Sequence, residues 1–196
     1  ARGAAPDARA AARLSHRTVN VSMPSFDQVA SLLVTRENLV ELAGTTDYDA
    51  VTACFVRYAQ KDDAGNVFFS LCEVAAAPLK DMFKPYELAG RELMCGLKIV
   101  LPRTGEVKKV ALTRLQNRTL QRDEYDEWRE CTQARYERNR QTGAYPMRTE
   151  NIHGHVRRLR ELRAARRLAE PYDERADVRD PANRSVDQLL ATRGGG

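Results

Sequence analysis

The residues that could perform acid–base, nucleophilic or metal chemistry are few and poorly placed for it. The three histidines, His16, His153 and His155, all lie outside the region in which we expect a folded core. Glycine-rich phosphate loops, nucleophile elbows and paired-histidine zinc motifs are absent from the sequence. The nearest thing to a carboxylate cluster crowds one predicted helix, where a solvated face is the usual interpretation: Asp123, Glu124, Asp126, Glu127 and Glu130. The sequence therefore predicts a binding module without catalytic residues, metal site or cofactor.

The cysteines and the hydropathy pattern indicate the redox compartment and the absence of a transmembrane helix. The four cysteines form no C-x-x-C pair and sit inside apolar patterns, which is typical of buried thiols in a reducing compartment: Cys54, Cys72, Cys95 and Cys131. No apolar run approaches the roughly 18 residues of a transmembrane helix, so no membrane role is expected.

Charge is distributed unevenly along the 196 residues. The central part, residues 24–134, carries 14 basic and 17 acidic residues, whereas the two flanks together carry 18 basic and 10 acidic ones. All six lysines lie in the central part, and the flanks use arginine alone, which forms two-pronged contacts with phosphate and carboxylate groups. The flanks are expected either to meet an acidic partner such as nucleic acid or to be solvated tails. Residues 1–20, nearly free of acidic residues, also suit a mitochondrial transit peptide.

Two short helices are predicted at the start of the central part. Ser25 and Gln28 form a capping box ahead of an apolar stripe at helical spacing. Thr35 is a second N-cap candidate, and Gly44 suits the position just after the end of that helix.

Two hairpins and a closing helix are predicted to follow. Residues 51–58 and 67–74 are expected to pair around a turn at 62–66, and residues 97–101 and 107–112 around a turn at 102–106. A short strand is expected at 86–88, and the closing helix begins after Leu120, which forms a hydrophobic staple with Tyr125. These elements predict an α+β module with a small antiparallel barrel or a strongly bent sheet.

Beyond the central part, one more helix is predicted. Residues 155–168 place Val156, Leu159, Leu162 and Ala165 on one face and surround them with arginines, which indicates a basic amphipathic helix outside the core. The predicted organisation is a disordered lead-in (1–23), the central domain (24–134), a linker with the basic helix (135–170) and a disordered tail (171–196).

Five groups of residues, in order along the central part, carry a likeness to one known family. They are 34–39 (VTRENL), 52–57 (TACFVR), 72–74 (CEV), 86–97 with its Gly96-Leu97 step, and 115–128 with Leu115-Gln116-Asn117 and Glu124 to Trp128. Together they resemble the Plus-three (Plus-3) domain of Rtf-type transcription elongation factors, subunits of the RNA polymerase II-associated (Paf) complex. The resemblance covers roughly residues 26–134.

The resemblance implies a Tudor-like barrel flanked by helices that docks on phosphorylated C-terminal repeats of the large NusG-like elongation factor. It matches Arg36 and Arg57 with the two arginines that hold a phosphothreonine, Thr35 with a small hydroxyl residue beside them, and Phe69 with an aromatic residue on the barrel wall. Guanidinium forks and a helix N-terminus both favour a phosphate. The expected protein is a nuclear, non-catalytic module that recruits the Paf complex to RNA polymerase II.

Alternatives remain at this level. Without the family, Arg57 would be interpreted as an ordinary exposed strand residue, and Ser70 and Ala111 stand where relatives carry basic residues, so a scaffold with a diverged pocket is one alternative. A second is single-stranded DNA or RNA binding, which the family also implies, through Lys108, Lys109, Arg114, Arg118 and the 157–167 arginines. A third role concerns the basic helix alone, which could dock on a partner subunit or back on the domain.

Overall fold

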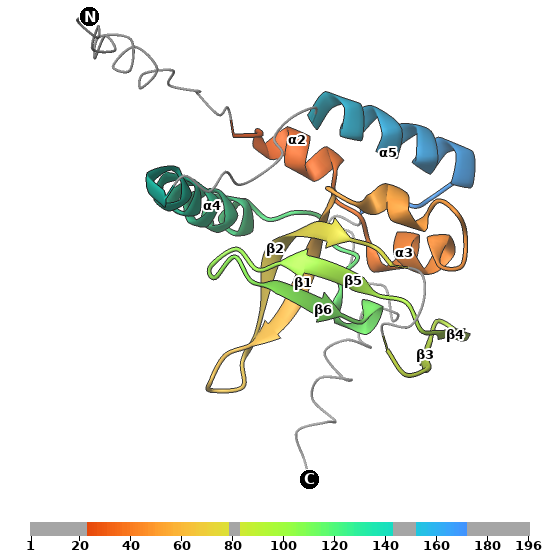
Figure 1. Cartoon of the computed structure of the whole chain (residues 1–196). Helices are drawn as coiled ribbons and strands as arrows, with labels where there is room; N and C mark the ends of the chain where they lie inside the picture. The colour runs from red at the N-terminus through yellow and green to blue at the C-terminus, as the bar shows by residue number, and fades with distance from the viewer. Residues whose placement is uncertain (1–22, 79–82, 143–151, 172–196) are drawn as a thin grey trace, which may run out of the picture.

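The computed structural model describes residues 23–78, 83–142 and 152–171. The predicted lead-in before Met23 and the predicted tail after Pro171 lie outside the described residues, as does His16. Within them, a bent antiparallel sheet is covered on one side by a long helix, while three shorter helices gather at one end of the sheet (Figure 1). The predicted α+β class is confirmed.

The two short helices begin at the predicted residues. Helix α2 (Phe26–Ser31) starts with the Ser25–Gln28 capping box, and helix α3 (Arg36–Leu42) starts with Thr35, whose Oγ1 accepts the Asn38 N–H at 3.1 Å. The second helix ends before Gly44, which has φ +82° and so occupies the left-handed conformation that glycine adopts at low cost.

The main sheet has the strand order β1-β2-β5-β6, with β1 at Phe55–Lys61, β2 at Val67–Ala76, β5 at Leu97–Val100 and β6 at Val107–Val110. Both predicted hairpins are confirmed. The first strand begins four residues later than predicted, because residues 48–51 form the 3-10 helix η2 (Tyr48–Val51). Tyr48 and Val51 are fully buried there, and the Tyr48 hydroxyl donates to the Gly96 carbonyl at 3.2 Å, so core packing overrides the local strand propensity.

The described strands do not close into a barrel. After β6 the chain turns through a 3-10 helix, η3 (Leu112–Arg114), and meets β1 only at the isolated bridge between Leu115 and Tyr58. A strongly bent open sheet is therefore the observed form. The predicted strand at 86–88 is β3 (Tyr86–Leu88), and it pairs with β4 (Arg91–Leu93), which the sequence did not indicate.

The closing helix α4 (Arg122–Thr142) covers the face of the sheet formed by β1 and β2. Trp128 packs edge-on against Phe55 with ring centroids 5.1 Å apart, and the Tyr125 hydroxyl donates to the Pro24 carbonyl at 2.7 Å. These contacts tie the helix to both the sheet and the start of the domain. Aromatic pairs of this kind add about 0.5–1.5 kcal/mol to the gain from burial.

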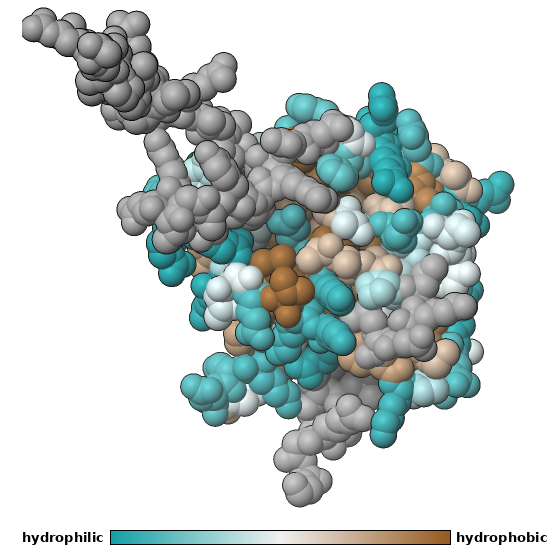
Figure 2. Space-filling view, viewed as in Figure 1, coloured by the Kyte–Doolittle hydropathy of each residue, from teal (hydrophilic) through white to brown (hydrophobic). Residues whose placement is uncertain are grey.

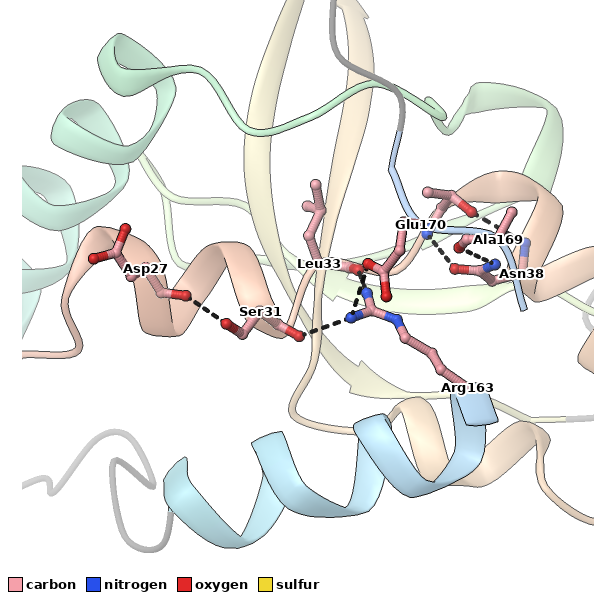
Figure 3. A network of polar contacts seen from close by, with 8 residues as sticks. Asp27, Ser31, Leu33, Asn38, Arg163, Ala169 and Glu170 are labelled. Atoms are coloured by element: carbon pink, nitrogen blue, oxygen red, sulfur yellow. Dashed lines mark hydrogen bonds and ion pairs between the residues drawn. The ribbon is translucent and has the colours of Figure 1, made fainter. Parts of the chain in front are cut away.

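Helix α5 (Ile152–Arg166) belongs to the core, so its prediction as a helix outside the core is wrong. Leu159 is 2% exposed and Leu162 is buried beside it. The Arg163 guanidinium donates to the backbone carbonyls of Ser31 and Leu33, at the end of α2 (Figure 3). The leucine stripe had to be covered by apolar surface, and the domain's own first helix and η2 supply that surface.

Candidate phosphopeptide-binding site

Arg36 is a largely buried cation whose guanidinium has no direct hydrogen-bond or ion-pair partner within the described residues. It is the first residue of α3 and is only 9% exposed. Burial lowers the pKa of Arg36, and the neighbouring Glu37 carboxylate acts in the opposite direction. Buried charges are normally paired, because desolvation is costly. An anionic ligand would therefore relieve an existing cost at this position.

The loop after η3 holds the backbone of Arg36 in place. The Arg36 N–H donates to the Gln116 carbonyl at 3.2 Å. Next to it, Asn117 binds Glu37 twice, accepting the Glu37 N–H at 3.0 Å and donating to its carboxylate at 2.9 Å. Thr35 is buried, and its hydroxyl accepts from Asn38 as the helix cap. The start of α3 is thus held on both sides by polar contacts.

Arg57, expected to be an exposed strand residue in the absence of a ligand role, is buried. It is 3% exposed, and the Glu124 carboxylate oxygen Oε1 accepts from its Nε at 3.1 Å and from its Nη2 at 2.7 Å. The Phe69 ring lies 5.3 Å from the guanidinium carbon, so this predicted pair does meet. The third nitrogen, Nη1, is buried and has no hydrogen-bond partner. The site thus contains one orphaned donor beside a satisfied ion pair.

The two predicted arginines are neighbours through the backbone. Gln116 donates its N–H to the Arg57 carbonyl at 3.1 Å and accepts the Arg36 N–H through its own carbonyl. One peptide segment therefore joins the strand that carries Arg57 to the helix start that carries Arg36. The donors of the two side chains differ in state, because those of Arg57 are largely occupied by Glu124, whereas those of Arg36 are not.

Glu124 is the residue that sequence reasoning misplaced. It was predicted to lie on a solvated helix face, yet it is 7% exposed. Its second oxygen, Oε2, accepts the Gln121 N–H at 3.3 Å, which is the contact that the third helical residue makes in a capping box. One sequence feature could have predicted its burial. Glu124 stands four residues before Trp128, and residues at that separation share a helix face.

The four residues predicted to bind nucleic acid do not lie on one surface. Lys108 and Arg114 both lie over the ring of Tyr58, at 5.7 and 6.0 Å from its centroid. Lys109 points to the opposite face of the sheet, where its cross-strand neighbour is Lys98. Arg118 follows Asn117 beside α3. The structure therefore brings two of the four together.

The positions that depart from the family pattern are structurally ordinary. Ser70 is buried, and its hydroxyl accepts from Gln60 at 2.7 Å. Ala111 is the half-buried residue before η3. Neither residue supplies a positive charge near Arg57.

Two other kinds of site have no counterpart in the described residues. Within residues 23–78, 83–142 and 152–171, no cluster of three or more histidine, cysteine, aspartate or glutamate residues has the arrangement of a metal site. A membrane-crossing helix is likewise absent from this described part of the chain. The visible surface in Figure 2 is mainly hydrophilic, with apolar residues in small groups.

The comparisons with known proteins identify the central region. No curated protein matches this chain. A family model described as the Plus-3 domain matches residues 28–133, which is more than half of the 196 residues and includes Arg36, Arg57, Phe69 and Glu124. Helix α3, the main sheet and the first half of α4 lie within this span, and on this match the chain belongs to the Plus-3 domain family.

Proposed function

We propose that this Plus-3 domain binds a phosphothreonine-containing peptide, namely the phosphorylated C-terminal repeat of the NusG-like elongation factor. Binding would recruit the Paf complex to RNA polymerase II in the nucleus, and no catalysis would be involved. The membership of the family supports a transcription-associated module. The peptide, the Paf subunits and the nuclear location are parts of this proposal, as is the likeness of the bent sheet to a Tudor barrel.

The observation that carries the proposal is Arg36, a residue only 9% exposed whose guanidinium has no hydrogen-bond or ion-pair partner within the described residues. A phosphothreonine brings a charge of about −1.5 to −2 and three acceptor oxygens, which suits a guanidinium whose donors are unused and whose backbone is held in place by Gln116. Arg57 and Phe69 lie on the adjoining strands, connected to Arg36 through Gln116. Burial at this place strengthens an ion pair, because solvent screens it less than at an exposed surface.

Replacing Arg36 by alanine is expected to weaken binding of a phosphothreonine peptide by about 10- to 100-fold, the value of one charged hydrogen-bonding group. Isothermal titration with phosphorylated and unphosphorylated repeats measures this. The matched control is Arg122→Ala, which also removes the first residue of a helix but is exposed and pairs with Asp126. Equal affinity of the unaltered domain for the two peptides would show that phosphate is not recognised.

A second candidate function, single-stranded nucleic-acid binding, is favoured by the two cations over the Tyr58 ring. The Tyr58 ring itself is buried, so this candidate depends on the two cations, which could contact the phosphates of a nucleic-acid backbone. Its affinity should fall with salt with a log–log slope of about −0.7 for each phosphate contacted.

The double variant Lys108→Ala, Arg114→Ala is expected to flatten that slope by about 1.4, since two contacts are lost. Fluorescence anisotropy with a single-stranded oligonucleotide over a salt series measures it. Lys109→Ala, on the opposite face, is the control and should remove no contact from this surface. An unchanged slope in the double variant would exclude this patch as the binding surface.

A further inference from the structure

The Arg57–Glu124 pair leaves Arg57 with an unequal distribution of partners. One carboxylate oxygen takes two of its donors, while the third nitrogen, Nη1, is buried without any. A buried donor without an acceptor is unfavourable, and more so when it is charged, because it has lost its hydrogen bonds to water without replacement. The hydrogen-bonding capacity of Arg57 is therefore incompletely satisfied by Glu124.

The pair also holds the first turn of α4. Glu124 is in that turn, and its two oxygens bind Arg57 on β1 and the Gln121 N–H at the helix start. Phe69, half-buried, closes the other side of the guanidinium. Because Arg57 is 3% exposed, a ligand reaches its guanidinium only if a group that covers it moves, and the first turn of α4, which carries Glu124, is one of these groups. Helix ends are the part of a helix that frays most readily.

A phosphate offers Arg57 what Glu124 does not. It carries up to twice the charge of a carboxylate and three acceptor oxygens, enough for Nη1 as well as for one of the donors that Glu124 now holds. The Gln116 backbone is hydrogen-bonded to the backbones of both Arg57 and Arg36. A ligand bound at Arg36 would therefore lie near the part of β1 that carries Arg57. The unphosphorylated peptide supplies no comparable anion and leaves the pair intact.

We propose that Glu124 is a built-in competitor of the phosphate: peptide binding transfers Arg57 from Glu124 to the phosphate and releases the first turn of α4. The inference rests on the proposed phosphopeptide function and adds its regulation. Glu124 lowers the affinity by the free energy needed to break its own contacts with Arg57. The same exchange links occupation of the site to the docking of α4 on the sheet.

The variant Glu124→Gln tests the competition. Glutamine keeps one carbonyl oxygen, which can still accept from Arg57, but it loses the charge and the second acceptor that now serves the Gln121 N–H. The affinity for the phosphothreonine peptide is therefore expected to rise about tenfold, as for one charged hydrogen bond. The affinity for the unphosphorylated peptide should stay unchanged. Glu127→Gln is the control: it removes the same charge from the same helix at a partly exposed residue that pairs with Arg103. It should change the affinity less than threefold.

The direction of the change separates competition from positioning, because removing a group that only positions Arg57 for the phosphate would weaken binding. Equal or weaker phosphopeptide binding by folded Glu124→Gln overturns the inference and indicates that Glu124 only positions Arg57. If the unaltered domain does not distinguish the two peptides, the proposed function itself fails, and that result is recognisable without any variant.

A measurement on the unaltered protein covers the case in which Glu124→Gln does not fold. Saturation with phosphothreonine peptide is expected to accelerate amide hydrogen exchange in the first turn of α4, including Tyr125, whose N–H donates to the Gln121 carbonyl at 3.2 Å. Saturation with unphosphorylated peptide should leave that exchange unchanged. Unaltered exchange in this turn with bound phosphopeptide overturns the proposed transfer.

Discussion

Replacing Leu159 by alanine is expected to lower the free energy of unfolding by about 2–5 kcal/mol, the usual cost of truncating a buried leucine. Leu159 is 2% exposed on the face of α5 that packs onto the domain. Because the family match ends at residue 133, a helix beyond it would ordinarily be regarded as dispensable. The core position of Leu159 instead makes α5 part of the folding unit.

Urea denaturation followed by circular dichroism measures the change. Arg158→Ala is the control on the same helix, since Arg158 is exposed and such changes usually stay within about 0.5 kcal/mol. An effect of Leu159→Ala no larger than that of the control would mean that α5 docks too weakly to contribute to stability.

Some of the arginines that make the C-terminal flank basic are bound within the domain. Arg163 binds two backbone carbonyls left open at the end of α2, and Arg166 forms an ion pair with Asp47 (Figure 3 shows the first of these). The segment after the helix is tied in as well, because Asn38 donates to the Ala169 carbonyl at 3.0 Å. Part of the basic excess in this flank therefore stabilises the domain and is not available to an acidic partner.

Local signals predicted the elements well where the interaction is local. Ser25 and Thr35 cap helices within four residues of themselves, so their sequence context contains the whole interaction. The same is true of the turn at Asp62 to Asn66, where the Asp62 carboxylate accepts from the Asn66 N–H at 2.8 Å. These contacts need no information from the rest of the chain.

The errors arose where distant residues decide the outcome. The strand pattern around Val51 gave way to a 3-10 helix because Tyr48 binds Gly96, nearly fifty residues away. Arg57 and Glu124 are separated by 67 positions, and each alone looks like a solvated charge. Family resemblance singled out Arg57 as a ligand residue, but only the packing of α4 on β1 reveals that a carboxylate already occupies it.

Breaking the Arg57–Glu124 pair from either side is expected to destabilise the domain by about 3–5 kcal/mol, because the remaining charge stays buried without a partner. We expect this for Arg57→Met and for Glu124→Leu, measured by urea denaturation. The double variant should lose clearly less than the sum of the two, since it leaves no unpaired charge and replaces the pair with apolar groups of similar size. The control pair is Arg103 and Glu127, an ion pair with an exposed arginine, where truncation should cost less than about 1 kcal/mol.

The size of the coupling in this cycle bears directly on the proposed exchange. A ligand phosphate can take Arg57 only by overcoming the interaction that the cycle measures. If the two single losses add up in the double variant, the residues do not interact across the α4–β1 contact, and Glu124 cannot compete with a phosphate. A coupling of about 1–3 kcal/mol would instead be in the range of one or two charged hydrogen bonds. In that case the interaction of Arg57 with a dianionic ligand that also satisfies Nη1 is strong enough to replace its interaction with Glu124. A much larger coupling would keep Arg57 bound to Glu124 and leave Arg36 as the cation on which phosphopeptide recognition depends.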